Sequence, residues 1–294
     1  MSAAGAFEAK SLCIIGTGLI GGSLALALKH NGYAGRIIGA GRTEQTLVDA
    51  KQLGVVDDYS TDMAAAVKDA DIIFISVPLG AIKPVLQSIQ PAVRADAIIT
   101  DAGSAKQSVI DDVRDVFGDN YAQFVPGHPI AGTENSGVRA AFAELYQNRR
   151  VILTPEPCTN EDAVEQVTAM WQMAGAQVTC MSAEHHDKVL AGTSHLPHML
   201  AFALVDCLNN LEDIDEIFQY AAGGFRDFTR IASSDPIMWR DICLHNSAPI
   251  IEMIERYQNE LDGIRQALQQ QDGDTLKQIF ERAKHARDAF TDKA

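Results

Sequence analysis

Short apolar runs alternate with helical patterns from Leu12 to about Ser182. Runs rich in β-branched residues are typical of buried strands, and the stretches between them have the spacing of amphipathic helices. This alternation predicts a parallel, doubly wound sheet, which is an α/β fold of the Rossmann type. The predicted strands cover residues 12–15, 36–40, 71–77, 97–100, 123–125, 151–154 and 177–181, and the predicted helices cover 23–29, 45–53, 82–89, 105–117 and 161–174.

Beyond Ser182 the pattern is helical throughout. Apolar residues recur at helical spacing between Asn246 and Arg265. Pro197 lies inside the first predicted helix, so we expect a kink there or a local geometry that replaces the lost hydrogen bond. The predicted helices cover residues 184–208, 216–222, 237–244, 248–270 and 274–289.

This change of pattern predicts two domains. Residues 1–182 would form a dinucleotide-binding Rossmann domain, and residues 183–294 an all-helical domain for substrate binding and dimerisation. Because long helices in such a domain often pair between subunits, we expect a homodimer.

A glycine-rich turn joins the first predicted strand to its helix. The order strand, G-x-G-x-x-G, helix is the context that a dinucleotide-binding turn requires. Gly16 would permit the tight turn, Gly18 would let the pyrophosphate approach the backbone, and Gly21 would let the helix pack closely on the strand. The amides at Leu19 and Ile20 would then face the phosphates. The alternative is an ordinary glycine-rich turn that binds nothing.

Ligands of such sheets bind at the carboxyl ends of the strands. We therefore expect Val77, at the end of the third predicted strand, and Pro78, directly after it, to contact the cofactor. The second predicted strand ends without the Asp or Glu that holds the ribose 2′-hydroxyl of NAD. Arg42 and Thr43 follow it and suit a 2′-phosphate, so they narrowly favour NADP over NAD. Alternatively, Arg42 covers the adenine or points to solvent, and NAD binds.

Composition and charge narrow the function classes. The 294-residue chain is 47% hydrophobic and carries a net charge of −15. This acidity argues against nucleic acids and anionic membranes as partners, and an anionic substrate would need local positive charge. The sequence has no apolar run of membrane-spanning length and no signal-peptide pattern in residues 1–10, so we expect a cytoplasmic protein. The five scattered cysteines predict reduced core residues and no zinc site.

Five stretches in one order resemble the prephenate/arogenate dehydrogenase family of tyrosine biosynthesis. They are GTGLIGGS, DAGSAK, GHPIAGTE, SHLPH and GGFRDFTRIASSDPIMW, and the similarity runs from about residue 11 to residue 290. The resemblance implies a Rossmann-type domain followed by a helical dimerisation domain. It also implies NAD(P)-dependent oxidative decarboxylation of prephenate to 4-hydroxyphenylpyruvate, or of arogenate to tyrosine.

The resemblance also implies roles for residues around the reacting ring. His128 resembles the histidine that hydrogen-bonds the ring hydroxyl and acts as base or acceptor. Ser104 resembles the serine that holds this histidine and meets the nicotinamide end of the cofactor.

The helical half supplies the remaining candidates. Arg230 resembles an arginine that binds a substrate carboxylate, which suits its fork of donors. His195 and His198 resemble histidines of the substrate pocket. Arg226 and Trp239 belong to the same motif as Arg230 and are weaker candidates. The family needs no metal, and we predict none here.

Structural alternatives stand beside these roles. His128 could be a turn residue satisfied by backbone, and Ser104 could cap the helix predicted from Ala105. His195 and His198 share a helix face and could bind zinc with Glu184, His185 or Asp187. Arg226 and Arg230 could pair with Asp227 and Asp235 on a solvated face.

Two other functions use the same fold. A β-hydroxyacid dehydrogenase or a pyrroline-carboxylate reductase shares the glycine turn and a helical second domain. The hydroxyacid enzymes would rely on a catalytic lysine there, and Lys188 is the lysine placed for that role. A sensor of NAD(P)H would bind the cofactor without turnover, and would need neither His128 nor Arg230.

Overall fold

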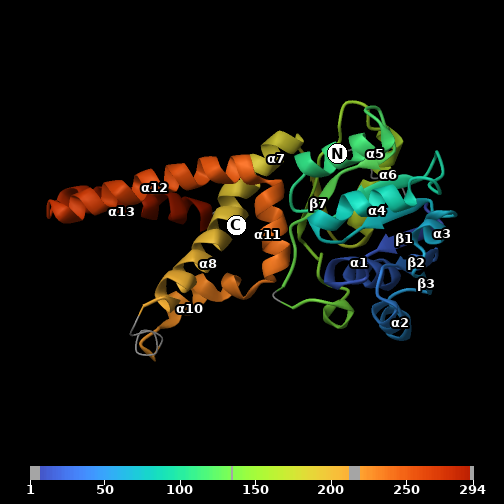
Figure 1. Ribbon diagram of the computed structural model, residues 1–294, viewed down its shortest axis with the longest axis horizontal. Coiled ribbons are helices and arrows are strands. Elements are labelled where there is room, and N and C mark those ends of the chain that lie inside the picture. Colours follow the sequence, from blue (N-terminus) through green and yellow to red (C-terminus); the bar gives the residue numbers. More distant parts are fainter. Residues whose placement is uncertain (1–6, 134, 212–218, 292–294) are drawn as a thin grey trace. The chain divides into compact units, whose positions relative to one another are not determined.

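Six parallel strands form the main sheet, in the order β3-β2-β1-β4-β5-β6, and Figure 1 labels the first three of these strands. The computed structural model describes residues 7–133, 135–211 and 219–291. The strand order reverses between β1 and β4, so the loops after these two strands border the crevice where doubly wound sheets bind ligands. The predicted fold class is confirmed. The strands are β1 (Ser11–Ile15), β2 (Arg36–Ala40), β3 (Asp58–Ser60), β4 (Ile72–Ile75), β5 (Ile98–Asp101) and β6 (Phe124–Val125).

Helices cover both faces of this sheet. Side chains of a strand alternate between faces, so Leu12 and Ile14 of β1 join one buried cluster, and Cys13 and Ile15 join the other. The helices and 3-10 turns of this part are α1 (Leu19–His30), α2 (Glu44–Gln52), α3 (Met63–Val67), η1 (Leu79–Ala81), α4 (Ile82–Ile89), α5 (Gln107–Phe117), η2 (Val138–Ala140) and α6 (Glu161–Met173).

Two strands that were expected to continue the main sheet form a second sheet instead, together with a short strand that was not predicted. It consists of β7 (Gly127–Pro129), β8 (Arg150–Leu153) and β9 (Gln177–Cys180) in that order, and β7 runs antiparallel to β8. The break falls at Pro126, directly after β6, and the Pro126 carbonyl accepts the Thr154 amide at 2.9 Å. Hydrophobic periodicity identifies a strand but not its pairing partner, so it did not reveal this division. It also missed β3, β7 and α3, which are short.

The next segment is helical but interrupted. The single helix predicted over 184–208 consists of α7 (Ala183–Leu190), one π-helical turn η3 (Ala191–His195) and α8 (Leu196–Asn209). Pro197 lies in the first turn of α8, where a missing amide donor costs little. The segment continues with α10 (Gly223–Thr229), η4 (Arg230–Ser233) and α11 (Pro236–His245) (Figure 1). Residues 216–218 of the helix predicted over 216–222 lie outside the described residues, and residues 220–222 are not helical.

The chain divides into two compact units, residues 1–247 and residues 248–294. The first unit contains the two sheets together with α7, α8, α10 and α11. The second is made by α12 (Ser247–Gln269) and α13 (Gly273–Thr291). None of the helices in the described part of the chain has both the length and the apolar character needed to cross a membrane.

Candidate functional site

The three glycines of the first turn differ in what surrounds them. Gly16 has φ +98°, and a Cβ there would lie 2.6 Å from the Ser76 carbonyl oxygen. A Cβ on Gly21 would lie 2.2 Å from the Gly16 carbonyl oxygen and 2.8 Å from Cγ2 of Ile14. A Cβ on Gly18 would meet no atom within 4 Å. Gly16 and Gly21 are therefore required by the fold, whereas Gly18 leaves open space beside the backbone.

The amino end of α1 has the features of an anion site. Gly18 is its N-cap, no side chain caps it, and no acidic residue occupies its first turn among the described residues. The first amides of a helix lack partners within the helix, and the helix dipole favours negative charge there. With the space beside Gly18, the residues present fit the pyrophosphate of a nicotinamide dinucleotide.

The other predicted cofactor contacts follow neighbouring strands. Val77 is half-buried and Pro78 exposed directly after β4, whereas Arg42 and Thr43 are exposed after β2. Thr43 is the N-cap residue of α2 but makes no side-chain cap hydrogen bond. The Arg42 guanidinium makes no ion pair with any described residue. Both side chains are therefore accessible at the edge where the adenosine end of a cofactor lies in such folds.

His128 lies on β7, and the backbone before it is clamped by buried charges. The Asp101 carboxylate accepts the Gly127 amide at 3.0 Å and is ion-paired with Lys106. The Lys106 ammonium donates to the Gly127 carbonyl at 2.7 Å. Because both charged side chains have no exposed surface, this clamp fixes β7 against the end of β5. Sequence reasoning missed both residues, although they bracket Ser104 in one motif and Asp101 directly follows the apolar strand predicted over 97–100.

A chain of hydrogen bonds leads away from His128. Its Nδ1 lies 2.8 Å from Nε2 of His186, and Nδ1 of His186 lies 2.8 Å from Oδ1 of Asp187. Asp187 also accepts the amides of Lys106 at 2.8 Å and Gln107 at 3.0 Å. His186 was not predicted, and Asp187 was considered only as a zinc ligand. The adjacent His and Asp at the start of a predicted helix were the available signal.

The alternative role for Ser104 as a helix cap is wrong. α5 begins at Gln107 with Lys106 in the N-cap position, and the Asp187 carboxylate binds the amides at this end. Ser104 itself is half-buried in the loop between β5 and α5. Its hydroxyl makes no hydrogen bond with His128, whose Nδ1 is occupied by His186.

His128 is buried and neutral. Burial lowers its pKa well below 6.5, and the neighbouring His186, Lys106 and His195 lower it further. The Nε2 atom makes no hydrogen bond with any described residue. A neutral imidazole with one unengaged nitrogen is suited to exchange a proton with a ligand.

Asn246, His195 and Trp239 form a second group of polar side chains, and two of their ring nitrogens have no hydrogen-bond partner in the described structure. Asn246 Nδ2 donates to the Asp187 carbonyl and to Nδ1 of His195, both at 2.9 Å. Nε2 of His195 and Nε1 of Trp239 are buried and have no hydrogen-bond partner in the described structure. Burial lowers the pKa of His195 to about 4, so its ring is neutral. Because Nδ1 accepts the hydrogen bond from Asn246, the ring carries its proton on Nε2. Two buried donors without partners indicate a place for ligand oxygens.

His198 and Arg230 border these donors. The His198 ring stacks on Trp239 with centroids 3.8 Å apart, and its Nδ1 donates to the Ser194 carbonyl at 2.9 Å. Burial lowers the pKa of His198, and the nearby charge of Arg230 lowers it further. Arg230 begins η4 and is exposed, so the structure puts a positive charge beside the buried donors.

Arg226 is exposed on α10, and it makes no ion pair with Asp227 or Asp235. Asp235 caps α11 instead, accepting the Met238 amide at 2.8 Å. The proposed pairing of these acids on a solvated face therefore fails for Arg226.

Two alternative chemistries find no support in the described residues. No group of three or more His, Cys, Asp or Glu side chains there is arranged to hold a metal ion. Lys188, the lysine that a hydroxyacid dehydrogenase would use, is exposed on α7 and paired with Glu184 at 2.7 Å.

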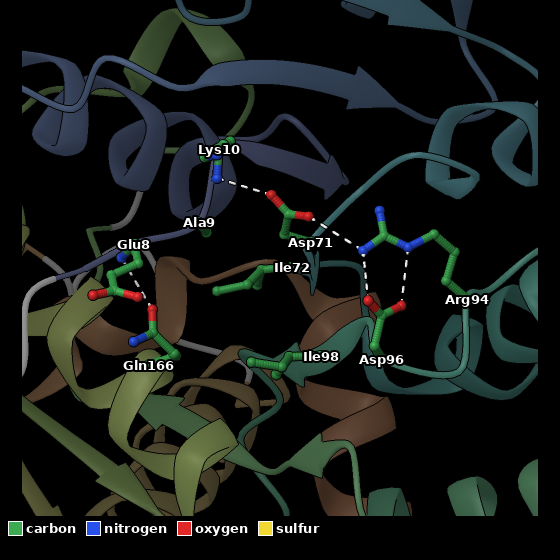
Figure 2. A pocket seen from close by; sticks show the side chains of 9 residues that line it. All are labelled: Glu8, Ala9, Lys10, Asp71, Ile72, Arg94, Asp96, Ile98 and Gln166. Carbon is green, nitrogen blue, oxygen red and sulfur yellow. Dashed lines mark hydrogen bonds and ion pairs between the residues drawn. The ribbon is translucent and has the colours of Figure 1, made fainter.

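A hollow of about 340 Å³ lies at the amino ends of strands of the main sheet, opposite to the carboxyl ends where the glycine turn lies. Figure 2 shows Arg94 there between Asp71 and Asp96, with N···O distances of 3.3 and 3.0 Å. Asp71 also accepts the Lys10 amide at 2.8 Å. The charges at the centre of this hollow satisfy one another, and none of the candidate residues lines it.

Comparisons with known proteins match both the sheet-containing part of the chain and its helical part. The family described as "Prephenate dehydrogenase, nucleotide-binding domain" matches residues 24–180, and "Prephenate dehydrogenase, dimerization domain" matches residues 182–282. The chain is 39% identical to a cyclohexadienyl dehydrogenase of Zymomonas mobilis, with 95% of each chain covered. It is 41% identical to a prephenate dehydrogenase of Bacillus subtilis, over 95% of this chain and 76% of that one.

A solved structure agrees with this. Prephenate dehydrogenase from A. aeolicus, in complex with hydroxyphenyl propionate and NAD+, has a TM-score of 0.89 and 35% identity, covering 96% of this chain and 98% of that one.

Proposed function

The chain belongs to the prephenate dehydrogenase family and is an NAD(P)-dependent dehydrogenase of tyrosine biosynthesis, and we propose that His128 is the base of its reaction. The observation that carries this role is the state of His128. It is buried and neutral, and its Nε2 is left without a partner at the carboxyl edge of the sheet.

The reaction removes a hydride from the ring carbon that bears the 4-hydroxyl. When bound, the nicotinamide supplies the hydride acceptor. His128 Nε2 takes the hydroxyl proton, and the electron density left on oxygen makes the ring carbon a better hydride donor. The bond to the ring carboxylate then breaks, CO₂ leaves, and the electron pair of that bond enters the ring. Aromatisation drives this last step, so the protein orients the carboxylate without protonating it.

The substrate is proposed to lie against the buried donors of the helical segment. Arg230 would bind a substrate carboxylate through its guanidinium, and the Nε2–H of His195 and the Nε1–H of Trp239 would donate to substrate oxygens. Their support is that both ring donors are buried without partners, and that Arg230 lies near the stacked His198. Arg226, exposed on the same segment, is a secondary candidate. Ser104 is proposed to face the nicotinamide from the β5–α5 loop.

Cofactor choice depends on the residues after β2. Arg42 and Thr43 are exposed where the adenosine ribose of the cofactor would lie, which supports NADP, and neither is an acid that would hold a 2′-hydroxyl. The A. aeolicus relative was solved with NAD+, which supports the alternative. Replacing Arg42 with Ala distinguishes the two cofactors. If the affinity for NADP falls and the affinity for NAD does not, Arg42 binds the 2′-phosphate.

We propose that the chain works as a homodimer, with a domain boundary near residues 182 and 183. The dimerisation-domain match and the exposed apolar side chains of α12 and α13 support the dimer. These side chains are Ile251, Leu261, Leu268, Phe280 and Phe290. Light scattering after gel filtration measures the state directly, and a monomeric mass would refute the proposal.

The first experiment is a two-by-two assay. Prephenate or arogenate is mixed with NAD or NADP, and reduced nicotinamide is followed by absorbance. We expect turnover with prephenate, and the four rates rank both substrates and both cofactors. The same assay is run on His128→Asn, whose kcat should fall by about 10²- to 10⁴-fold while cofactor affinity is unchanged. Wild-type turnover in this variant would remove His128 from the mechanism.

A further inference from the structure

We propose that His186 and Asp187 are positioning residues that hold His128 in the neutral tautomer whose Nε2 is the base. They also stabilise the positive charge that His128 gains with the proton. The inference rests on the proposed role of His128, and it explains why Nε2, and not Nδ1, would meet the substrate.

Two groups that bind Asp187 have a fixed hydrogen-bonding role. The backbone amides of Lys106 and Gln107 can only donate, and they donate to Oδ1 and Oδ2 of Asp187 at 2.8 and 3.0 Å. Burial alone would raise the pKa of Asp187, but hydrogen bonds from His186 and these two amides outweigh it and lower the pKa. Asp187 is therefore a carboxylate and accepts hydrogen bonds through both oxygens.

The ring of His186 must then carry its proton on Nδ1. That atom lies 2.8 Å from Oδ1 of Asp187, and two acceptors at this distance would repel. Burial lowers the pKa of His186, so the ring is neutral and its Nε2 bears a lone pair.

The hydrogen bond to His186 fixes the tautomer of His128 in the same way. Its Nδ1 lies 2.8 Å from the lone pair on Nε2 of His186, so Nδ1 of His128 is the protonated nitrogen. The lone pair of His128 is left on Nε2, which makes no hydrogen bond with any described residue. Neither ring turns freely, because His186 is fully buried and only 8% of the His128 surface is exposed.

The arrangement also accounts for the charge that the reaction creates. When Nε2 accepts the hydroxyl proton, His128 becomes an imidazolium whose Nδ1–H still donates to His186, which in turn donates to the Asp187 carboxylate. The other carboxylate near His128, Asp101, is already ion-paired with Lys106. His195 is neutral. Asp187 is therefore the negative charge that this chain of hydrogen bonds couples to His128.

Two substitutions at one position separate this role from simple packing. A glutamine at 186 carries its terminal oxygen close to the place of Nε2, and can still accept from His128. An asparagine is shorter, reaches only to the place of Nδ1, and leaves His128 without its acceptor. We expect kcat to fall by about 10²- to 10⁴-fold in His186→Asn, as when a supporting residue behind a catalytic histidine is removed. His186→Gln should recover at least about tenfold of that loss, with KM values within about threefold of wild type.

Matched controls come from the preceding residue. His185 is exposed on the same helix, so His185→Gln and His185→Asn should leave kcat unchanged. Equal losses in the two His186 variants, or no loss in His186→Asn, would overturn the proposal. His128→Asn is assayed alongside: if it is inactive while both His186 variants are normal, only the positioning role fails, and if it is active, the base assignment itself fails.

A measurement on the unmodified protein tests the tautomer without relying on any active variant. ¹⁵N NMR of histidine-labelled protein at neutral pH distinguishes protonated from unprotonated ring nitrogens, and the His128→Asn spectrum identifies the His128 signals. We expect a protonated Nδ1 and an unprotonated Nε2 on His128. The opposite pattern would refute the inference.

Discussion

The glycine turn allows a prediction in which two similar substitutions affect different properties of the protein. Gly21→Ala would place a methyl group 2.2 Å from the Gly16 carbonyl oxygen, whereas Gly18→Ala would place one where no atom lies within 4 Å. The first change should destabilise the fold, and the second should weaken cofactor binding. Both residues lie on the same turn, so each variant is the control for the other.

The cost of Gly21→Ala follows from how firmly its neighbour is held. The Gly16 carbonyl accepts from the Ser76 hydroxyl at 2.7 Å, and the Gly16 amide donates to Ala40 at 2.9 Å. The oxygen would have to retreat by about 1 Å to reach an ordinary C···O contact. Overpacking costs about 1–3 kcal/mol, and the helix propensity of alanine returns less than about 1 kcal/mol. We expect a net loss of about 2 kcal/mol, which lowers Tm by roughly 4–8 °C.

Gly18→Ala should fold normally. Gly18 has an extended backbone with a negative φ of −76°, which alanine can adopt, and alanine in the N-cap position costs up to about 1 kcal/mol relative to glycine. Its methyl group would occupy the space expected for the pyrophosphate and raise the cofactor Kd by roughly 10- to 100-fold, or about 1.4–2.8 kcal/mol. Thermal unfolding by circular dichroism and cofactor titration by calorimetry measure the two effects. A Gly21→Ala protein as stable as wild type, or a Gly18→Ala protein that binds cofactor normally, would refute the reasoning.

Three further predictions concern the charged groups. Arg230→Ala should raise the KM for prephenate by roughly tenfold or more, because it removes the group that binds a substrate carboxylate. The KM for the cofactor should be unchanged. A normal KM for prephenate would show that the carboxylate binds elsewhere. The fall of kcat/KM at low pH should occur below pH 6.5, because His128 must be neutral to accept a proton and burial holds its pKa below that value. A fall that begins above pH 6.5 would contradict this. Asp101→Ala should lower the free energy of unfolding, measured by urea titration, by about 3–5 kcal/mol, because it leaves the Lys106 ammonium buried without its partner. A loss below about 1 kcal/mol would show that the clamp is not needed for stability.

Several parts of the fold could be predicted because their signals are local. The helix α4 occurs at its predicted bounds, and β1 and β2 agree within one residue. The roles of Gly16 and Gly21 were also predictable, since a positive φ and close strand–helix packing are properties of a short segment. A kink or a replaced hydrogen bond was expected at Pro197, and only the structure showed that a π-helical turn ends directly before the first turn of α8, which contains this proline.

The candidate site was only partly predictable. His128, His195 and His198 stand in recognisable motifs, and the structure shows how each is held. The partners that hold His128 and His195 were not predicted: His186 is 58 positions from His128 in the sequence, and Asn246 is 51 positions from His195.

The sequence by itself determined the alternation of strands and helices, the glycine turn and the motifs that carry the chemistry. These follow from periodicity and backbone conformation, which depend on neighbours within a few residues. The tertiary structure alone decided that β7, β8 and β9 form a separate sheet, and that Asp187 caps α5 and stands behind His186. Such pairings depend on which distant segments meet in space, and a hydrogen bond between side chains leaves no trace in the local pattern of either segment.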